Sequence, residues 1–254
     1  GHAEDEFWKW MASWSVMLRR PSDLGYPNEG YDLPPLNTVQ HTVGVDYAPS
    51  MDTGLLFPIQ AATMQERLAA RRSTVDDRVA KAAMVTPSEG PFVWWCNLNA
   101  ESEALARAIP GAVEVRGSDS ETDKERKLID FSEGRIRVLV TKPSICGFGM
   151  NWQHCCETGF VGLNDSFEQV YQAQRRFWRF GQTRPVNVHF IASEIEGAVV
   201  ANLKRKEADA ERMAAAMVLH MADLSSRAVR GATRDRGEYN PTETMRTPEW
   251  LAAE

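Results

Sequence analysis

Short apolar runs alternate with longer amphipathic segments from Phe92 to about Met221, and this alternation constrains the fold more than any other feature. The runs have the length and composition of β-strands, and the segments between them have the periodicity of helices. Strands joined through helices pair in parallel, and the crossover helices cover both faces of the sheet. The sequence therefore predicts an α/β fold with a mostly parallel sheet. The predicted strands are 92–96, 112–115, 136–141, 159–163 and 186–192, and the predicted helices are 99–109, 120–134, 166–181 and 194–221.

The chain before this region is expected to begin with a helix and a linker. Aromatic and aliphatic residues between Phe7 and Leu18 predict a helix that ends near Pro21, because proline disfavours helix in the preceding residue. The stretch from Ser22 to Pro35 is rich in turn-forming residues. A strand is predicted at 37–45 and a helix at 58–84. The basic residues of that helix are expected on a solvated face: Arg67, Arg71, Arg72 and Arg78.

These segments divide the chain into three regions. Residues 1–36 form the helical segment and linker, residues 37–221 the α/β lobe with its C-terminal helix, and residues 222–254 a polar tail. Glycine and proline interrupt the tail, which is either flexible or packed across the lobe through Trp250.

Composition and charge narrow the class of protein. The chain has 254 residues, 43% of them hydrophobic and 25% charged, as in ordinary globular domains. No apolar run is long enough to cross a bilayer and no leader is recognised, so a cytoplasmic protein that binds no membrane is expected. The net charge is −6, so a nucleic-acid site must be a local basic patch. Arg175 to Lys206 is such a patch, with seven basic residues against Glu194 and Glu196.

The four cysteines are expected to be reduced thiols, because the chain is long and carries no leader. Cys146 and the run His154-Cys155-Cys156 raise the alternative of zinc, for example in a zinc-dependent nuclease. Their spacing contains no C-x-x-C pair, so we predict no metal site and place these thiols in loops or the core.

The segment 166–181 concentrates positive charge. Ser166 and Gln169 form a capping box and Gly181 is a candidate left-handed cap, so a helix of about four turns is predicted. One face of that helix would carry Gln172, Arg175, Arg176 and Arg179. No acid stands three or four residues from these arginines, and like charges four residues apart repel. The stripe is either a solvated basic face or a site for an anion from elsewhere.

Two loops are expected at the carboxyl edge of the sheet, where ligands of parallel α/β folds gather. One spans 116–120 and the other 141–151. Gly147 and Gly149 allow backbone amides to approach a phosphate, and Thr141, Lys142 and Ser144 add donors.

Three ordered motifs resemble the Swi/Snf-like branch of superfamily 2 helicases and translocases, over most of the chain from about Val16 to Glu207. The first motif is Met17-Leu18-Arg19-Arg20 with Asp32-Leu33-Pro34-Pro35. The second consists of Gly117-Ser118, Arg126, Phe131, Val140-Thr141-Lys142 and Gly147-Phe148-Gly149-Met150-Asn151. The third consists of Gln172, Arg176, Arg179 and Gly181-Gln182. The chain departs from the family pattern where the family commonly has an acid at Arg175, a histidine at Trp178 and Ala-Gly at Pro143-Ser144.

The resemblance implies a C-terminal RecA-like lobe. Arg176 and Arg179 would be catalytic arginine fingers, and ATP would also be contacted by Gly149, Asn151, Gln172 and Gln182. Nucleic acid, DNA with RNA as the alternative, would be contacted by Arg116, Gly117, Ser118, Thr141, Lys142, Ser144 and Gly147. The P-loop pattern G-x-x-x-x-G-K-[ST] is absent from the sequence, so ATP and Mg²⁺ would be held mainly by the N-terminal lobe. The chain alone would then be inactive.

A different class of function stays open. A lobe of this fold can serve as a non-catalytic nucleic-acid or protein interaction module without ATP turnover.

Overall fold

A computed structural model of the chain describes residues 7–8, 10–11, 14–15, 17–44, 72–146, 149–162, 166–194 and 197–230. Contacts divide the chain into a smaller unit, Gly1–Asn28 with Met213–Glu254, and a larger unit, Glu29–Arg212. Both units are described separately below, and every site lies in the larger one. None of the described helices is both long and apolar enough to cross a membrane.

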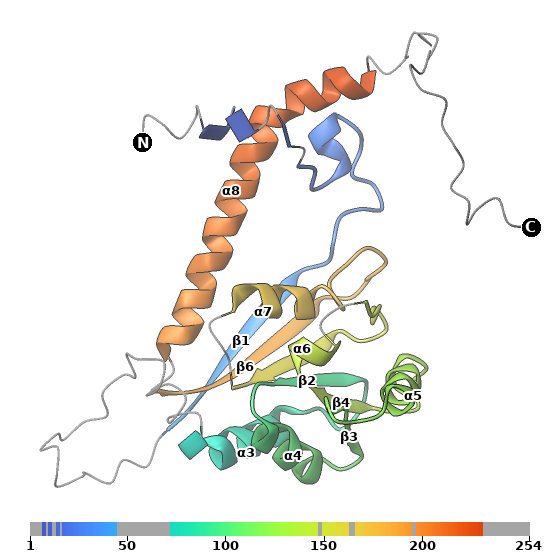
Figure 1. The fold of residues 1–254 in the computed structure, drawn as a ribbon, viewed down its shortest axis with the longest axis vertical. Coiled ribbons are helices and arrows are strands. Elements are labelled where there is room, and N and C mark those ends of the chain that lie inside the picture. The colour runs from blue at the N-terminus through green and yellow to red at the C-terminus, as the bar shows by residue number, and fades with distance from the viewer. Residues whose placement is uncertain are drawn as a thin grey trace, which may run out of the picture. The chain divides into compact units, whose positions relative to one another are not determined.

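The larger unit is built on one six-stranded sheet in the order β1-β6-β5-β2-β4-β3 (Figure 1). Every neighbouring pair is parallel, so the α/β, RecA-like arrangement predicted from the alternating pattern is confirmed. The strands are β1 (Leu36–Val43), β2 (Phe92–Cys96), β3 (Ala112–Glu114), β4 (Val138–Thr141), β5 (Glu157–Val161) and β6 (Val186–Ser193). The described helices of the chain are η1 (Pro21–Leu24), α3 (Val75–Val85), α4 (Asn99–Ala108), α5 (Glu121–Ser132), α6 (Pro143–Cys146), α7 (Phe167–Gln174) and α8 (Gly197–Arg230). Of these, η1 and the part of α8 from Met213 onward belong to the smaller unit.

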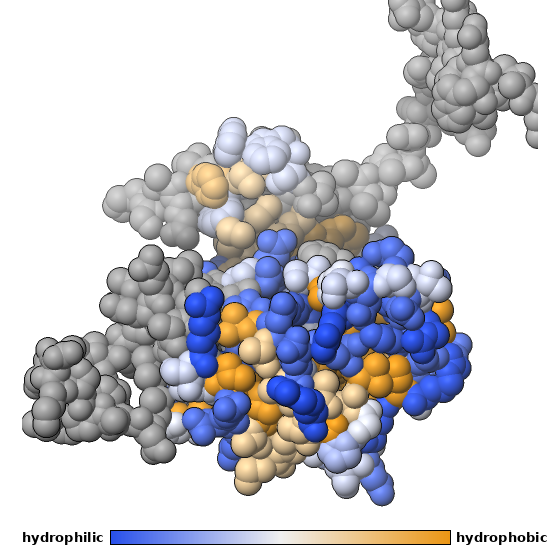
Figure 2. Space-filling view, turned by 60° about the horizontal axis from the view of Figure 1, so that its bottom comes forward, coloured by the Kyte–Doolittle hydropathy of each residue, from blue (hydrophilic) through white to orange (hydrophobic). Residues whose placement is uncertain are grey.

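Helices cover both faces of the sheet, and β2 shows why. Its five residues are all buried, since Val93 and Trp95 face one layer while Phe92, Trp94 and Cys96 face the other. The first layer includes Phe131 of α5 and Val170 of α7, and the second includes residues of α3 and α4. A strand enclosed on both faces reads as a continuous apolar run. On the surface, hydrophilic side chains are interspersed with hydrophobic ones (Figure 2).

Several predicted boundaries need correction. The C-terminal helix α8 begins at Gly197 and continues to Arg230, so the first nine residues of the predicted tail, 222–230, are helical. The predicted helix 58–84 is described only from residue 72, and α3 begins after a turn at Thr74. Residues 58–71 and 231–254 lie outside the described residues.

The smaller unit has its own apolar cluster. Trp8 and Met217 are buried there, and Met11, Met17 and Ala216 pack against them. Part of the predicted N-terminal helix is therefore covered by the C-terminal helix of the same unit.

A buried ion pair joins α3 to α4. Arg78 and Glu101 have fully buried side chains, and Nη1 of Arg78 lies 2.7 Å from Oε1 of Glu101. The second carboxylate oxygen accepts hydrogen bonds from the backbone N–H groups of Asn97, at 3.0 Å, and Leu98, at 2.8 Å. Glu101 therefore caps the start of α4, which the sequence assigned to Asn99. The prediction of a solvated Arg78 is wrong, because the carboxylate that neutralises it stands far from it in the sequence.

The loop after β5 leaves room for this pair. Gly162 has a φ of +73°, and a Cβ atom there would lie 2.0 Å from Oε1 of Glu101. Only glycine adopts this conformation readily and leaves the carboxylate in place. The ion pair thus fixes α3, α4 and the end of β5 together.

Replacing Glu101 with glutamine should destabilise the fold strongly. The change leaves the Arg78 guanidinium buried without a countercharge, and the free energy of unfolding should fall by about 3–5 kcal/mol. Urea unfolding followed by circular dichroism measures this. The control Glu103→Gln, on the exposed side of α4, should change the same quantity by less than about 0.5 kcal/mol. Equal losses in both variants would contradict a structural role for the pair.

Candidate functional site

The predicted nucleic-acid residues gather in one open pocket, the β3–β4 pocket, of about 350 Å³. Because β3 and β4 are parallel neighbours, the loops after them meet at the carboxyl edge of the sheet. Five of the predicted residues line the pocket: Arg116, Gly117, Ser118, Lys142 and Ser144. The sequence analysis missed Asn99, Ser102 and Glu103, which α4 adds to the same pocket. Asn99 at the start of that helix was a signal that could have placed it there.

The two cations of the β3–β4 pocket have different partners. Nε of Arg116 donates to Oε2 of Glu114 at 2.7 Å, and Nη2 lies 3.9 Å from Glu103. The hydrogen bond and charge of Glu114 raise the pKa of Arg116. Lys142 instead donates to the neutral amide oxygen of Asn99 at 2.5 Å. Glu114 therefore partly neutralises the charge of Arg116, whereas the partner of Lys142 is neutral and leaves its charge available to a ligand.

Two predicted nucleic-acid residues do not join this pocket. The Thr141 side chain is fully buried, and its hydroxyl donates to the carbonyl of Val115 at 3.2 Å and lies 3.3 Å from Sγ of Cys146. Thr141 belongs to the core, so the phosphate contact predicted for its hydroxyl is not available in this structure. Gly147 lies outside the described residues.

The arginine-bearing segment begins as predicted but ends as a helix much earlier. The Ser166 hydroxyl accepts a hydrogen bond from the backbone N–H of Gln169 at 3.4 Å, which caps α7. After Gln174, the backbone N–H groups of Arg176 and Phe177 bond three residues back instead of four, each at 3.1 Å. The side chain of Phe177 is fully buried, so the backbone turns toward the core at this residue. Residues 175–180 therefore form a turn, which we call the arginine turn.

The shorter helix separates Arg175 from the other two arginines. Its guanidinium carbon lies 4.5 Å from the centroid of the Trp178 ring and 4.9 Å from that of Tyr171. These are cation–π distances. The predicted four-residue stripe is therefore wrong, and Gly181, with a φ of +92°, follows a turn instead of a helix.

Arg176 and Arg179 contact only neutral oxygens within the described part of the chain. Arg176 donates to the carbonyl of Gln172 at 3.0 Å, to that of Met150 at 3.3 Å, and to the Gln172 amide oxygen at 3.3 Å. Arg179 donates to the amide oxygen of Asn151. Its Nε is buried and has no hydrogen-bond partner there.

The two guanidinium groups also carry like charges within one short turn. Burial lowers the pKa of Arg176, and the positive charge of Arg179 lowers it further. Neither group has a carboxylate within salt-bridge distance among the described residues. Two partly buried like charges held by neutral oxygens are a favourable site for an anion, which would supply the missing countercharge.

The remaining predicted ATP residues fall into two groups. Asn151 and Gln172 hold the arginines directly, and Gly149, with a φ of +82°, lies two residues before Asn151. Gln182 is only 6% exposed, and its side chain is fully occupied. Its amide N–H groups donate to the carbonyls of Gln153 and Cys155 at 3.0 and 3.1 Å, and its oxygen accepts from two backbone N–H groups that follow it. Gln182 braces the arginine turn, so the predicted ATP contact is not available to its amide.

The thiols behave as core residues. Cys155 is buried, its Sγ lies 3.2 Å from the carbonyl of Pro91, and burial raises its pKa. Nε2 of His154 is buried without a partner within the described residues, and burial lowers the pKa of that imidazole. Over the described ranges, no three His, Cys, Asp or Glu side chains are grouped to hold a metal ion.

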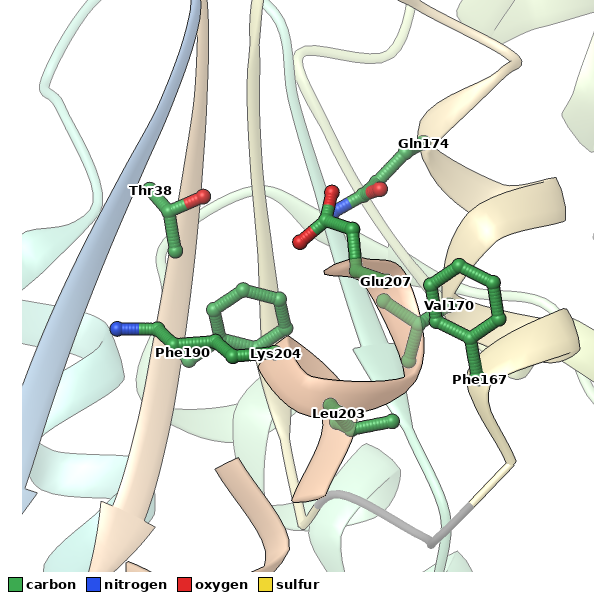
Figure 3. Close-up of a pocket in the computed structure, with 8 residues that line it drawn as sticks. All are labelled: Thr38, Phe167, Val170, Gln174, Phe190, Leu203, Lys204 and Glu207. Carbon is green, nitrogen blue, oxygen red and sulfur yellow. The ribbon is translucent and has the colours of Figure 1, made fainter. Parts of the chain in front are cut away.

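A separate apolar pocket lies between β1, β6, α7 and α8 (Figure 3). Its volume is about 40 Å³, which is room for about three water molecules. Phe167, Val170, Phe190 and Leu203 form its walls, and Gln174 and Glu207 point toward it. It is too small for a nucleotide and is not the candidate site.

Comparison with known proteins adds three solved structures. A scan against protein-family models finds no match, and neither does a search of curated proteins. The C-terminal part of the Fun30 ATPase domain is 17% identical with a TM-score of 0.45, over 56% of this chain and 48% of that chain, so the match spans about half of its length. The C-terminal domain of the DEAD-box protein Dbp5 is 14% identical with a TM-score of 0.45, over 54% and 79%. A DEAD box protein from the hyperthermophile Methanococcus jannaschii is 17% identical with a TM-score of 0.45, over 52% and 37%.

Replacing Gln182 with alanine should reduce stability. The buried carbonyls of Gln153 and Cys155 would lose their donor, and the free energy of unfolding should fall by about 1–3 kcal/mol. The matched change Gln172→Ala removes an amide that is only partly buried and should destabilise less. Thermal unfolding of both variants provides the comparison. Equal and small losses of stability in both variants would contradict a structural role for the Gln182 amide, which would then again be a candidate contact with ATP.

Proposed function

We propose that this chain is the second motor lobe of a nucleic-acid-dependent ATPase of the helicase or translocase type. In this proposal Arg176 and Arg179 reach the triphosphate of an ATP molecule bound at a first lobe. One observation carries the proposal: two partly buried guanidinium groups belong to the same short turn, and among the described residues only neutral oxygens hold them. A solvated basic face would leave such groups in water, and a structural pair would have a carboxylate.

The contacts of the arginines explain how they would act. The carbonyl of Gln172 and the amide of Asn151 fix the orientation of the two forks without neutralising their charge. Preoriented donors stabilise the negative charge that grows on the phosphoryl oxygens as the γ-phosphate departs. The guanidinium repulsion would be relieved at the same moment. Binding and charge stabilisation at one site are the chemistry that this lobe contributes.

Magnesium is expected from the first lobe. ATP hydrolysis needs Mg²⁺ to bridge the β- and γ-phosphates. The described residues contain no cluster of three His, Cys, Asp or Glu side chains that could hold this ion, so its ligands would come from the first lobe. The same reasoning makes ATP turnover by the 254-residue chain alone negligible.

The β3–β4 pocket is our candidate contact with the nucleic-acid backbone. Lys142, Ser118 and Ser144 offer one ammonium group and two hydroxyl groups to a phosphate. Glu103 and Glu114 partly neutralise Arg116 nearby, so the contact would be weak. Phosphate contacts position a protein without reading bases. The family resemblance favours DNA over RNA.

Lysine at position 176 or 179 should not perform the function of the arginine that it replaces. Arg176→Lys and Arg179→Lys in a protein with both lobes should lower single-turnover ATP hydrolysis by about 10³–10⁵, because lysine lacks the planar fork. In the 254-residue chain, the same variants should lose tripolyphosphate binding by calorimetry. The melting temperature should change little, since the variants keep the charge and do not remove an ion pair.

The control for this experiment is Arg175→Lys, which keeps the charge of the segment but changes an arginine outside the pair. It should hydrolyse ATP far better than the other two. Near-normal hydrolysis in Arg176→Lys and Arg179→Lys would leave a non-catalytic interaction module as the better function.

Binding to a duplex should weaken steeply with salt. If Lys142 neutralises one phosphate, Lys142→Ala should reduce the slope of log K against log salt by about 1. Fluorescence anisotropy with labelled DNA of two unrelated sequences, repeated with RNA, measures the slopes and the preference. Arg135→Ala removes an equal charge outside the pocket and should leave the slope unchanged. A slope that Lys142→Ala does not alter would remove the pocket from the nucleic-acid site.

A further inference from the structure

The linker before β1 is tied by two contacts to the arginine turn and by a third to the start of β6. The indole N–H of Trp178 donates to the carbonyl of Pro34 at 2.6 Å. The rings of Tyr31 and Phe180 have centroids 5.3 Å apart. The backbone N–H of Val186 donates to the carbonyl of Pro35 at 2.9 Å. Side chains therefore join residues 31–34 to residues 178–180, and a backbone hydrogen bond joins Pro35 to Val186.

Trp178 is also held on its face. The guanidinium of Arg175 stacks on the indole at 4.5 Å, while the backbone N–H of Trp178 bonds to the carbonyl of Gln174 at 2.9 Å. Arg175 and Trp178 are the positions where the sequence departs from the Swi/Snf-like pattern of an acid and a histidine. The two departures contact each other as a cation–π pair.

Each of these residues precedes one of the two arginines of the proposed site. Arg175 is followed by Arg176, and Trp178 is followed by Arg179. Trp178 and Arg179 are thus adjacent residues of the same turn. Beside the contacts lies an open groove of about 500 Å³, lined on one side by Gly30 to Pro34 and on the other by Phe180 to Thr183. The three contacts therefore hold the linker beside an open groove.

We propose that Trp178 is a positioning residue that couples the linker to Arg179. A linker shift that breaks the Pro34 bond would release the arginine turn, and an anion on Arg179 would in turn favour the docked linker. The inference rests on the proposed function and names how the same site is regulated. The occupant of the site is the polyphosphate of a nucleotide, and the signal is the position of the linker.

The test uses Trp178→Phe in the 254-residue chain. Phenylalanine keeps an aromatic face for Arg175 and removes the indole donor, together with part of the apolar area that Trp178 packs against the core. We expect amide hydrogen exchange to rise together in 31–36 and in 177–182, by about five- to tenfold, the effect of losing one hydrogen bond. The affinity for tripolyphosphate, measured by calorimetry, should fall by a similar factor. The melting temperature should change little.

Two further variants separate the tether from simple packing. Tyr31→Phe keeps the ring contact with Phe180 and should leave exchange and affinity as in the unmodified chain. Arg175→Lys removes the planar stack but keeps the charge, and should loosen residues 177–182 while disturbing 31–36 less. Faster exchange in the linker alone, with unchanged exchange and affinity at the arginine turn, would overturn the coupling.

Failure of the proposed function gives a different result. If the unmodified chain binds no tripolyphosphate but Trp178→Phe still loosens both segments together, the tether exists and the arginine site is not a phosphate site. If the chain binds tripolyphosphate and Trp178→Phe binds it equally, the site stands and the coupling is wrong.

Discussion

The buried ion pair between Arg78 and Glu101 is the interaction on which most of the larger unit depends. Glu101 neutralises a guanidinium of α3, caps the start of α4 and fills the space beside Gly162 at the end of β5. The start of α4 carries Asn99, and Asn99 holds the ammonium group of Lys142 in the β3–β4 pocket. The geometry of the candidate nucleic-acid contact is thus set by a charge pair that never meets the ligand. A buried pair of this kind is weak evidence for net stability, but its loss from one side is costly.

The partners of the arginines, more than their number, distinguish structure from function in this chain. Arg78 is paired inside the core and Arg116 is paired at the surface. Arg175 lies against aromatic rings. Arg176 and Arg179 have oriented but neutral partners, so their charge is the part of the basic surface that is held in place and still uncompensated. That difference, and not the basic composition of the segment, supports an anion site.

Sequence reasoning was reliable where the determinants are local. The buried strand Phe92–Cys96 and the caps at Ser120 and Ser166 depend on neighbouring residues, and the structure confirms them. It failed where distant residues decide. Arg78 was placed in water because Glu101 stands 23 residues away. The helix of the arginine segment was extended too far, because the burial of Phe177 cannot be seen in a helical repeat. Gln182 matches a family motif, yet its side chain bonds to five backbone groups and therefore stabilises the turn.

The position of β1 has a consequence for how the chain acquires its structure. Among the described strands, β1 is first in the sequence and pairs only with β6, and His41 and His189 meet across a separation of 148 residues. Contacts of such high sequence separation form late, because the loop between them must first be closed. During synthesis from the N-terminus, β1 can pair with β6 only after β6 has been synthesised. The linker and the Trp178 tether would then be completed after the rest of the sheet, as the closing step of folding.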